Sequence, residues 1–306
     1  MNLSTSVGSV RLPNPVMTAS GTAGHGLELA RYLDISELGA VVVKSLAAYE
    51  WAGNAAPRVH PAAAGMLNSV GLQGPGLARW LERDLPKLAE AGARVVVSVW
   101  GRTVQDYALV CDALGATNSQ AMSAVVAVEV NVSCPNLEDR GQMFSHSATA
   151  TKDVLASTQG CGLDCWAKLS ATGNLTEIAS AAIEGGAKGL TLINTLLGMA
   201  IDTQTRQPVL GGGGGGLSGA AIGPVALRAV FDVYAEMPEV PIVGVGGISS
   251  AQDCLAMLMA GASAVQVGTA TFADPRAPAK VLAGLASWCE QQGVETLEEI
   301  IGVAHG

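Results

Sequence analysis

Eight short runs rich in β-branched residues recur along the chain, and a segment long enough for a helix follows each. The runs are continuously apolar rather than alternating, as expected for strands buried on both faces of a parallel sheet. The predicted strands are Val16–Ala19, Ala40–Lys44, Arg94–Val99, Val125–Asn131, Cys165–Leu169, Gly189–Ile193, Pro241–Val245 and Ala264–Gly268. Eight strand–helix units in this order predict a closed (β/α)8 TIM barrel more strongly than an open doubly wound sheet.

Amphipathic or alanine-rich segments lie between these runs and predict the helices. They are Leu27–Leu38, Leu77–Ala91, Val104–Leu114, Ala148–Thr158, Leu175–Gly185, Gly223–Glu236, Ser250–Met259 and Ala277–Gln291. Ser250 with Asp253 three residues later is a capping-box pattern, and Gly261 follows the same helix. Barrels of this length are ordinary single domains, so we expect residues 1–306 to form one domain.

Charge and hydropathy argue against binding of nucleic acid and against insertion into a membrane. The formal net charge is −9 and no basic run occurs, which disfavours binding of nucleic acid. Every apolar run is far shorter than the roughly 18 to 20 residues that a membrane span needs. The segment 1–11 lacks the basic and apolar regions of a signal peptide. We therefore expect a cytoplasmic protein without a membrane anchor.

The six cysteines do not resemble a disulfide framework, because they are sparse for so long a chain. Cys161 and Cys165 have a C-x3-C spacing, but no second Cys or His pair lies nearby to complete a zinc or iron–sulfur site. We expect reduced thiols and no metal site.

Two predicted loops, residues 45–76 and 194–219, are too long for a minimal barrel. Both follow strands at the carboxyl-terminal face, where barrel enzymes build their sites, so we expect them to cover a substrate. The second loop contains a glycine run, residues 211–216, which is either a flexible connector or directly functional.

Polar or glycine residues stand at the ends of the predicted strands. They are Ser20-Gly21, Lys44-Ser45, Ser98, the segment Asn-Val-Ser-Cys-Pro-Asn at 131–136, Lys168, Asn194-Thr195, Gly246-Gly247 and Gly268-Thr269. A polar ring at this rim is expected of a catalytic barrel.

Individual positions in the ring suggest an anionic ligand. The bare backbone at 246–247 and 268–269 lets N–H groups approach a phosphate, although tight turns alone also use glycine. Lys44 and Lys168 end apolar strands, where an ammonium needs an anion unless it extends to solvent. Together these positions indicate an anionic cofactor and an anionic substrate.

Asparagines and one cysteine complete the ring. Asn68, Asn131, Asn136 and Asn194 offer donors and acceptors that suit a planar heterocycle with amide edges, although such residues are also common in turns. Cys134 precedes the rigid Pro135 and could act as a nucleophile or base once deprotonated. The alternative is a buried, inert thiol.

Longer motifs resemble one enzyme family. NVSCPN at 131–136, GLTLINTLLGMAID at 189–202, GGLSG at 215–219, PIVGVGGISS at 241–250 and GASAVQVGT at 261–269 closely resemble the class 1 dihydroorotate dehydrogenases. ASGTAGHG at 19–26 and NSVGLQGPG at 68–76 extend the similarity over essentially the whole chain. Within the class, the chain is most similar to the NAD-linked (1B) subclass, in which the catalytic subunit works with an iron–sulfur flavoprotein.

The resemblance implies oxidation of dihydroorotate to orotate in pyrimidine biosynthesis, with FMN across the barrel mouth. The FMN would contact Ser20, Gly21, Lys44, Ser45, Ser98, Asn131, Lys168, Ile193, Gly219, Gly246, Gly247, Gly268 and Thr269. Dihydroorotate would contact Lys44, Asn68, Ser69, Val70, Gly71, Leu72, Asn131, Asn136, Asn194 and Thr195. Cys134 would take the C5 proton while a hydride leaves C6 for the flavin N5, and Lys168 would stabilise negative charge on the reduced ring.

The subclass also implies a partner subunit that carries FAD and a [2Fe–2S] cluster and links to NAD, in a heterotetramer; a homodimer is the alternative assembly. This chain itself has neither an iron–sulfur Cys cluster nor a GxGxxG motif after a strand. It departs from the family pattern at Ser98, commonly Asn, and at residues 170–173 and 211–214. Two other functions stay open: a related FMN barrel that reduces a pyrimidine base, as in dihydropyrimidine dehydrogenase, and a barrel that binds FMN or a phosphorylated metabolite without turnover.

Overall fold

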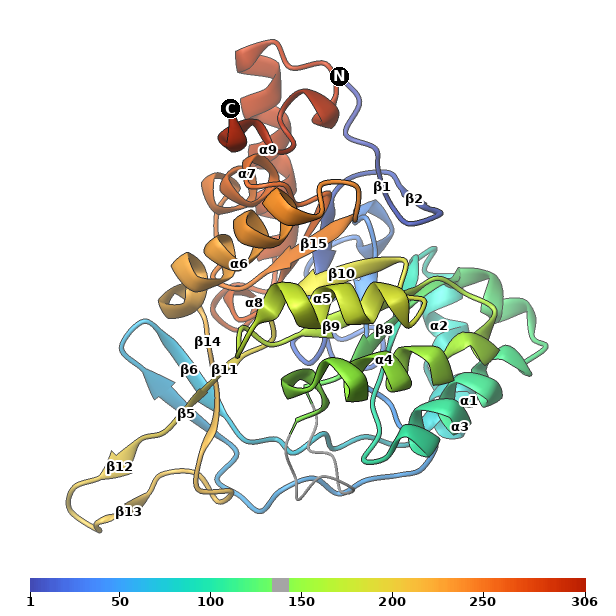
Figure 1. Cartoon of the computed structure of the whole chain (residues 1–306), viewed down its shortest axis with the longest axis vertical. Helices are drawn as coiled ribbons and strands as arrows, with labels where there is room; N and C mark the ends of the chain where they lie inside the picture. The colour runs from blue at the N-terminus through green and yellow to red at the C-terminus, as the bar shows by residue number, and fades with distance from the viewer. Residues whose placement is uncertain (134–142) are drawn as a thin grey trace.

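An eight-stranded parallel sheet forms the centre of the structure, a computed structural model that describes residues 1–133 and 143–306 (Figure 1). Its strands are β3 (Val16–Thr18), β4 (Val41–Val42), β7 (Val95–Val99), β8 (Val125–Asn131), β9 (Cys165–Leu169), β10 (Gly189–Leu192), β15 (Ile242–Val245) and β16 (Ala264–Val267). Their order is β3-β16-β15-β10-β9-β8-β7-β4, and a parallel bridge between Met17 and Ala40 joins the two ends. Each strand falls within a predicted run, so the predicted barrel is confirmed.

Helices flank the barrel in Figure 1, at most of the predicted positions. They are α1 (Leu77–Arg83), α2 (Leu85–Glu90), α3 (Val104–Gly115), α4 (Ala148–Ser157), α5 (Leu175–Glu184), α6 (Gly223–Glu236), α7 (Ala251–Met259), α8 (Ala270–Ala273) and α9 (Ala277–Gln292). The capping box of Ser250 and Asp253 is present at the start of α7, as predicted.

The helix predicted over residues 27–38 is wrong. Only a 3-10 turn, Ile35–Glu37, forms there, after isolated turns such as the one in which the N–H of Ala30 donates to the carbonyl of Leu27. Asp34 begins the 3-10 turn, because its carboxylate accepts a hydrogen bond from the backbone N–H of Ser36 at 2.9 Å. Such local side-chain bonds compete with the helix for backbone donors.

The helix predicted over residues 77–91 is two helices, α1 and α2, which meet at Asp84. Pro86 lies in the first turn of α2. Proline has no N–H to donate and is tolerated only in the first turn of a helix, so it ends α1 and starts α2.

A hairpin of β1 (Thr5–Val7) and β2 (Val10–Leu12) closes the amino-terminal end of the barrel. Val7 and Leu12 are fully buried against residues inside the barrel, among them Met17 and Trp166. Apolar side chains fill this end, and the large cavity lies at the opposite end, at the carboxyl ends of the strands.

The two long loops pair with each other over the open end. Loop 45–76 forms β5 (Val59–Ala62) and β6 (Gly65–Asn68), and loop 194–219 forms β11 (Leu196–Gly198) and β14 (Gly215–Ser218). These strands make one antiparallel sheet in the order β11-β14-β6-β5, which we call the mouth sheet. A hairpin of β12 (Ile201–Asp202) and β13 (Gln207–Pro208) projects from it at the lower left of Figure 1.

Part of the glycine run 211–216 packs closely against loop 45–76, which favours a packed segment over a flexible connector. A Cβ at Gly212 would overlap the hydroxyl of Ser69, and one at Gly215 would overlap the carbonyl of Asn68. Only glycine allows this approach of the two loops, and the run therefore fixes how they lie together.

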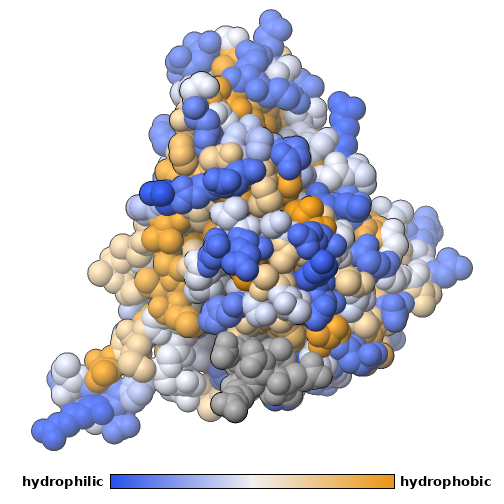
Figure 2. Space-filling model, viewed as in Figure 1, coloured by the Kyte–Doolittle hydropathy of each residue, from blue (hydrophilic) through white to orange (hydrophobic). Residues whose placement is uncertain are grey.

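Exposed apolar side chains lie beside the mouth. Leu197 is 73% exposed, Ile201 58% and Phe272 59%. Figure 2 shows apolar surface along α6 and again near the base of the β12–β13 hairpin. Across residues 1–133 and 143–306, no helix is long and apolar enough to span a bilayer.

Candidate active site

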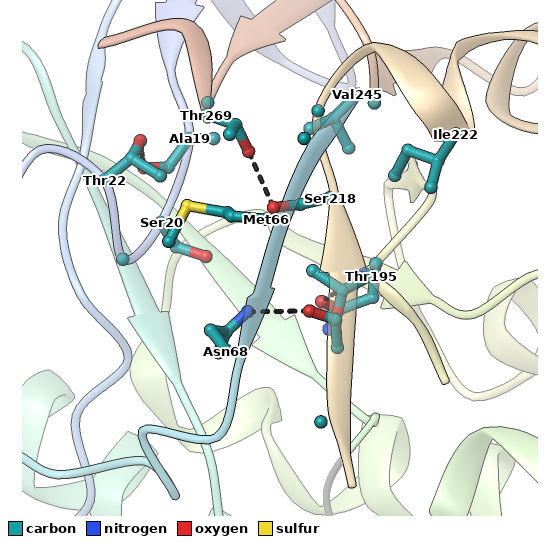
Figure 3. Close-up of a pocket in the computed structure, with 18 of the residues that line it drawn as sticks. Ala19, Ser20, Thr22, Met66, Asn68, Thr195, Ser218, Ile222, Val245 and Thr269 are labelled. Carbon is teal, nitrogen blue, oxygen red and sulfur yellow. Dashed lines mark hydrogen bonds between the residues drawn. The ribbon is translucent and has the colours of Figure 1, made fainter. Parts of the chain in front are cut away.

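A cavity of about 860 Å³ opens between the carboxyl ends of the barrel strands and the mouth sheet (Figure 3). Its size is typical of sites that hold a cofactor or drug-sized ligand. Strand ends supply its floor and one wall, and residues 65–72 and 215–219 supply the opposite wall. The long loops thus cover the open end of the barrel, as predicted.

Almost every described residue that was predicted for the site lines this cavity. These residues are Ser20, Gly21, Lys44, Ser45, Asn68, Ser69, Val70, Gly71, Leu72, Asn131, Lys168, Ile193, Asn194, Thr195, Gly219, Gly246, Gly247, Gly268 and Thr269. Cys134 and Asn136 lie outside the described residues. Ser98 does not line the cavity: it lies fully buried within β7, and its hydroxyl is 2.9 Å from that of Ser45.

Lys168 occupies the floor of the cavity and already has an anion as its partner. Its Nζ lies 3.2 Å from Glu129 Oε1 and donates to Gln266 Oε1 and Ser20 Oγ, also at 3.2 Å. A bound anion is therefore not needed to balance this lysine, which corrects our inference that its ammonium points to an anionic ligand. The strand β9 itself is apolar apart from Lys168, as predicted. Glu129 and Gln266 are fully buried in the barrel, below the cavity.

A chain of hydrogen bonds orders the amides beside this floor. The amide of Asn194 donates to Asn131 Oδ1 at 3.0 Å, and the amide of Asn131 donates to Ser45 Oγ at 3.4 Å. The hydroxyl of Tyr107 holds the backbone carbonyl of Asn131 at 2.7 Å. These bonds fix the rotamers of both asparagines, so their faces toward the cavity are already arranged for a ligand.

The loops after β15 and β16 form a cradle of bare backbone. Gly247 has a φ of +76°, and a Cβ there would overlap the backbone of Gly223 at the start of α6. A Cβ at Gly268 would lie 3.2 Å from that of Ala19. Exposed N–H groups without side chains suit an oxyanion such as phosphate. The residues present here fit the phosphate of a nucleotide.

One side-chain bond ties the mouth sheet to the barrel, and another joins two strands within the sheet. Thr269 Oγ1 donates to Ser218 Oγ at 2.8 Å, and Figure 3 shows these two side chains facing each other. Asn68 on β6 donates to the carbonyl of Gly216 on β14 at 3.3 Å, the second dashed contact in Figure 3. These contacts connect the cradle wall to the strand that carries Asn68.

Loop 68–72 has an unusual backbone that is held in place by its neighbours. Leu72 has a φ of +63°, which is rare for a residue with a side chain. The Trp51 indole donates to the carbonyl of Gly71 at 3.0 Å, and the Asn54 amide donates to Ser69 Oγ at 2.8 Å. The loop is therefore pinned at both ends against the cavity.

Sequence reasoning missed the polar layer under the floor. Glu129 stands two residues before Asn131, and the period of two along a strand places both on one face. That spacing could have identified Glu129, but the surrounding valines made the strand read as uniformly apolar. Ser133 and Ser170 also line the cavity, and their hydroxyls are bonded at 2.7 Å.

The cysteines that the structure describes lie away from the cavity. Cys161 and Cys165 lie with Sγ atoms 3.4 Å apart, beside Cys111 of α3. Burial raises the pKa of Cys254 to about 12. None of the described cysteines lines the cavity.

Comparisons with known proteins agree with the site. A family model described as dihydroorotate dehydrogenase matches residues 2–288. A protein of Alkaliphilus metalliredigens named dihydroorotate dehydrogenase B (NAD(+)), catalytic subunit, is 43% identical, over 99% of this chain and 98% of that protein. A Geotalea uraniireducens protein of the same name is 42% identical, over 98% and 97%. An Aquifex aeolicus protein named putative dihydroorotate dehydrogenase A (fumarate) is 42% identical, over 100% and 99%. The chain therefore belongs to the dihydroorotate dehydrogenase family.

Proposed function

We propose that this chain oxidises dihydroorotate to orotate, with FMN bound in the cavity at the barrel mouth. One observation carries the proposal: a chain that matches the family over almost its whole length brings its predicted cofactor and substrate residues together around one cavity. The cavity combines a phosphate cradle, fixed amides and two lysines, which are the groups that an anionic flavin and an anionic pyrimidine need.

FMN would be held by its phosphate at residues 246–247 and 268–269, which line the cavity. Its ring would lie near Ser20, Ser45 and Lys168. When bound, FMN supplies the acceptor for the hydride that leaves C6 of the substrate. Lys168 would stabilise the negative charge that develops on the reduced ring.

Dihydroorotate would lie against loop 68–72, with Lys44 pairing with its carboxylate. Asn131 and Asn194 would bind its ring amides, because each offers both a donor and an acceptor. Thr195 and Asn136 would complete the substrate contacts.

Cys134 would take the proton from C5 as the hydride leaves C6. Its position in the chain supports this role: the preceding residue, Ser133, lines the cavity, and its N–H donates to Asn131 Oδ1 at 3.2 Å. A positioned general base typically contributes about 10²- to 10⁴-fold to the rate.

We further propose that the electrons leave through a separate subunit that carries FAD and a [2Fe–2S] cluster and links to NAD, in a cytoplasmic heterotetramer or a homodimer-based assembly. Several relatives are named as catalytic subunits, which supports a partner. Reoxidation of the isolated chain's flavin by fumarate, at a rate that sustains turnover, would instead support the acceptor named for the Aquifex relative.

The proposal is tested on the purified chain under anaerobic conditions. We expect it to hold FMN in equimolar amount and its flavin to bleach on addition of dihydroorotate but not of dihydrouracil. Bleaching by dihydrouracil alone would favour the dihydropyrimidine dehydrogenase reading. A flavin that neither pyrimidine bleaches would favour a binding protein without turnover, and failure to bind FMN would exclude the whole assignment.

A further inference from the structure

We propose that Glu129 is a positioning residue that sets the reduction potential of the flavin by opposing the charge of Lys168 from below. The inference rests on the proposed function, since it needs FMN in the cavity. Glu129 is not among the residues that the family resemblance implied for the site, and it does not line the cavity.

Glu129, Lys168 and Gln266 form a closed triad across the inside of the barrel. Glu129 Oε1 is 3.2 Å from Lys168 Nζ, and Glu129 Oε2 accepts from Gln266 Nε2 at 2.6 Å. Gln266 Oε1 in turn accepts from Lys168 Nζ at 3.2 Å. The three side chains come from β8, β9 and β16, so the triad joins two sides of the barrel that are not adjacent in the sheet.

The triad fixes the ammonium at one point. Glu129 and Gln266 are 0% exposed and Lys168 is 4% exposed, so water contributes little to balancing their charge. An ammonium has three donors, and Ser20 takes the one that faces the cavity, at 3.2 Å. Lys168 therefore presents its charge upward to the cavity while its other two donors hold it to the barrel.

Lys168 lines the cavity and Glu129 lies behind it, so the two opposite charges act on a ligand in the cavity in opposite senses. The floor carries an ammonium at the surface and a carboxylate directly beneath it, a pair with no net charge. In a water-poor site, such fixed charges act strongly on charge that develops nearby. The carboxylate weakens the stabilisation that Lys168 gives to a negatively charged reduced ring. The reduction potential of the flavin therefore stays low enough for the reduced flavin to pass its electrons to the next acceptor.

Replacing the carboxylate with its neutral isostere isolates this effect. Glu129→Gln keeps the shape and an acceptor for Lys168 but leaves the ammonium without a counter-charge. We expect the reduced flavin to be favoured by at least tenfold over wild type, which is a rise of about 30 mV in the two-electron midpoint potential. The potential is measured against a reference dye during stepwise reduction with dithionite, so no substrate turnover is needed.

Thr191→Val is the matched control. Thr191 is fully buried on β10 in register with Lys168, and its hydroxyl has no hydrogen-bond partner among the described residues. The substitution perturbs the same layer without changing charge, so its potential should equal that of wild type. A shift in Thr191→Val as large as that in Glu129→Gln would mean that any change in this layer moves the potential, and would overturn the proposal.

A second variant keeps the test decisive if Glu129→Gln does not fold. Glu129→Asp retains the charge but shortens the side chain by one methylene, which moves the carboxylate away from Lys168. We therefore expect a smaller rise in the reduction potential than in Glu129→Gln. An unchanged or lowered potential in whichever variant binds FMN would overturn the role of Glu129. If wild type itself fails to bind FMN or to be reduced by dihydroorotate, the proposed function fails instead, and the two failures are thereby distinguished.

Discussion

The buried ion pair of Lys168 and Glu129 makes a prediction about stability that can be worked out from the structure. Lys168→Met removes the ammonium and leaves Glu129, whose side chain is 0% exposed, with the neutral Gln266 as its one remaining side-chain partner among the described residues. Removing one partner of a buried pair costs about 3–5 kcal/mol. Each kcal/mol shifts the melting temperature of a large domain by roughly 2–4 °C, so the variant should melt roughly 6–20 °C below wild type.

The double variant Lys168→Met/Glu129→Gln separates stability from chemistry. It leaves no buried charge, and replacing both members of such a pair is often nearly neutral, so most of the lost stability should return. Flavin reduction by dihydroorotate should stay slow, by roughly 10²- to 10³-fold, because the charge-stabilising donor is still missing.

The assay is thermal and urea unfolding of wild type, both single variants and the double variant, followed by circular dichroism without FMN. The four stabilities give the coupling energy between the two residues. If the double variant is as unstable as the sum of the single losses, the pair is not coupled and the reasoning from burial is wrong.

Three further predictions concern Cys134, the glycine run and the start of α7. Cys134→Ala should slow flavin reduction by dihydroorotate roughly 10²- to 10⁴-fold with FMN retained, and a rapid-mixing rate within about threefold of wild type would remove Cys134 from the mechanism. Gly212→Ala should lower kcat/KM for dihydroorotate roughly tenfold or more without loss of FMN, because its Cβ displaces the hydroxyl of Ser69. Gly214→Ala, whose Cβ meets only the carbonyl of Gly198 at 3.4 Å, is the control, and equal effects of the two would contradict the close-packing argument. Asp253→Asn should cost up to about 1 kcal/mol at pH 7, because it removes the negative charge from the first turn of α7. Burial alone would raise the pKa of Asp253, but hydrogen bonds from Ser249 and Ser250 outweigh burial and lower the pKa below 3.8. The stability advantage of wild type should therefore persist above pH 3.8 and disappear as the pH falls further. A stability difference in urea unfolding that does not change with pH would refute this.

The sequence predicted the barrel well because its signal is strong and local. Strands buried on both faces appear as uninterrupted apolar runs, and β7 and β8 match their predicted ranges closely. The helix predicted over 27–38 failed because periodicity does not register a side-chain bond such as that from Ser36 to Asp34.

The sequence predicted which residues line the cavity, but not which of them pair or hydrogen-bond with each other. Strand ends converge at one face of a barrel, so polar residues there could be assigned to the cavity without knowing any distance. The sequence did not predict the mouth sheet, because the pairing between β6 and β14 joins segments that are far apart in the chain, and one of them is glycine-rich. One of the partners of Lys168 was missed for the same reason, because Gln266 lies 98 residues further along the chain.

The central claim is that dihydroorotate is oxidised by flavin held in this cavity. The direct measurement is a single turnover without oxygen, in which FMN-loaded protein is mixed with excess dihydroorotate and both flavin absorbance and orotate are quantified. Orotate should form in an amount equal to the FMN reduced. Flavin that remains oxidised, or that is reduced without formation of orotate, would contradict it.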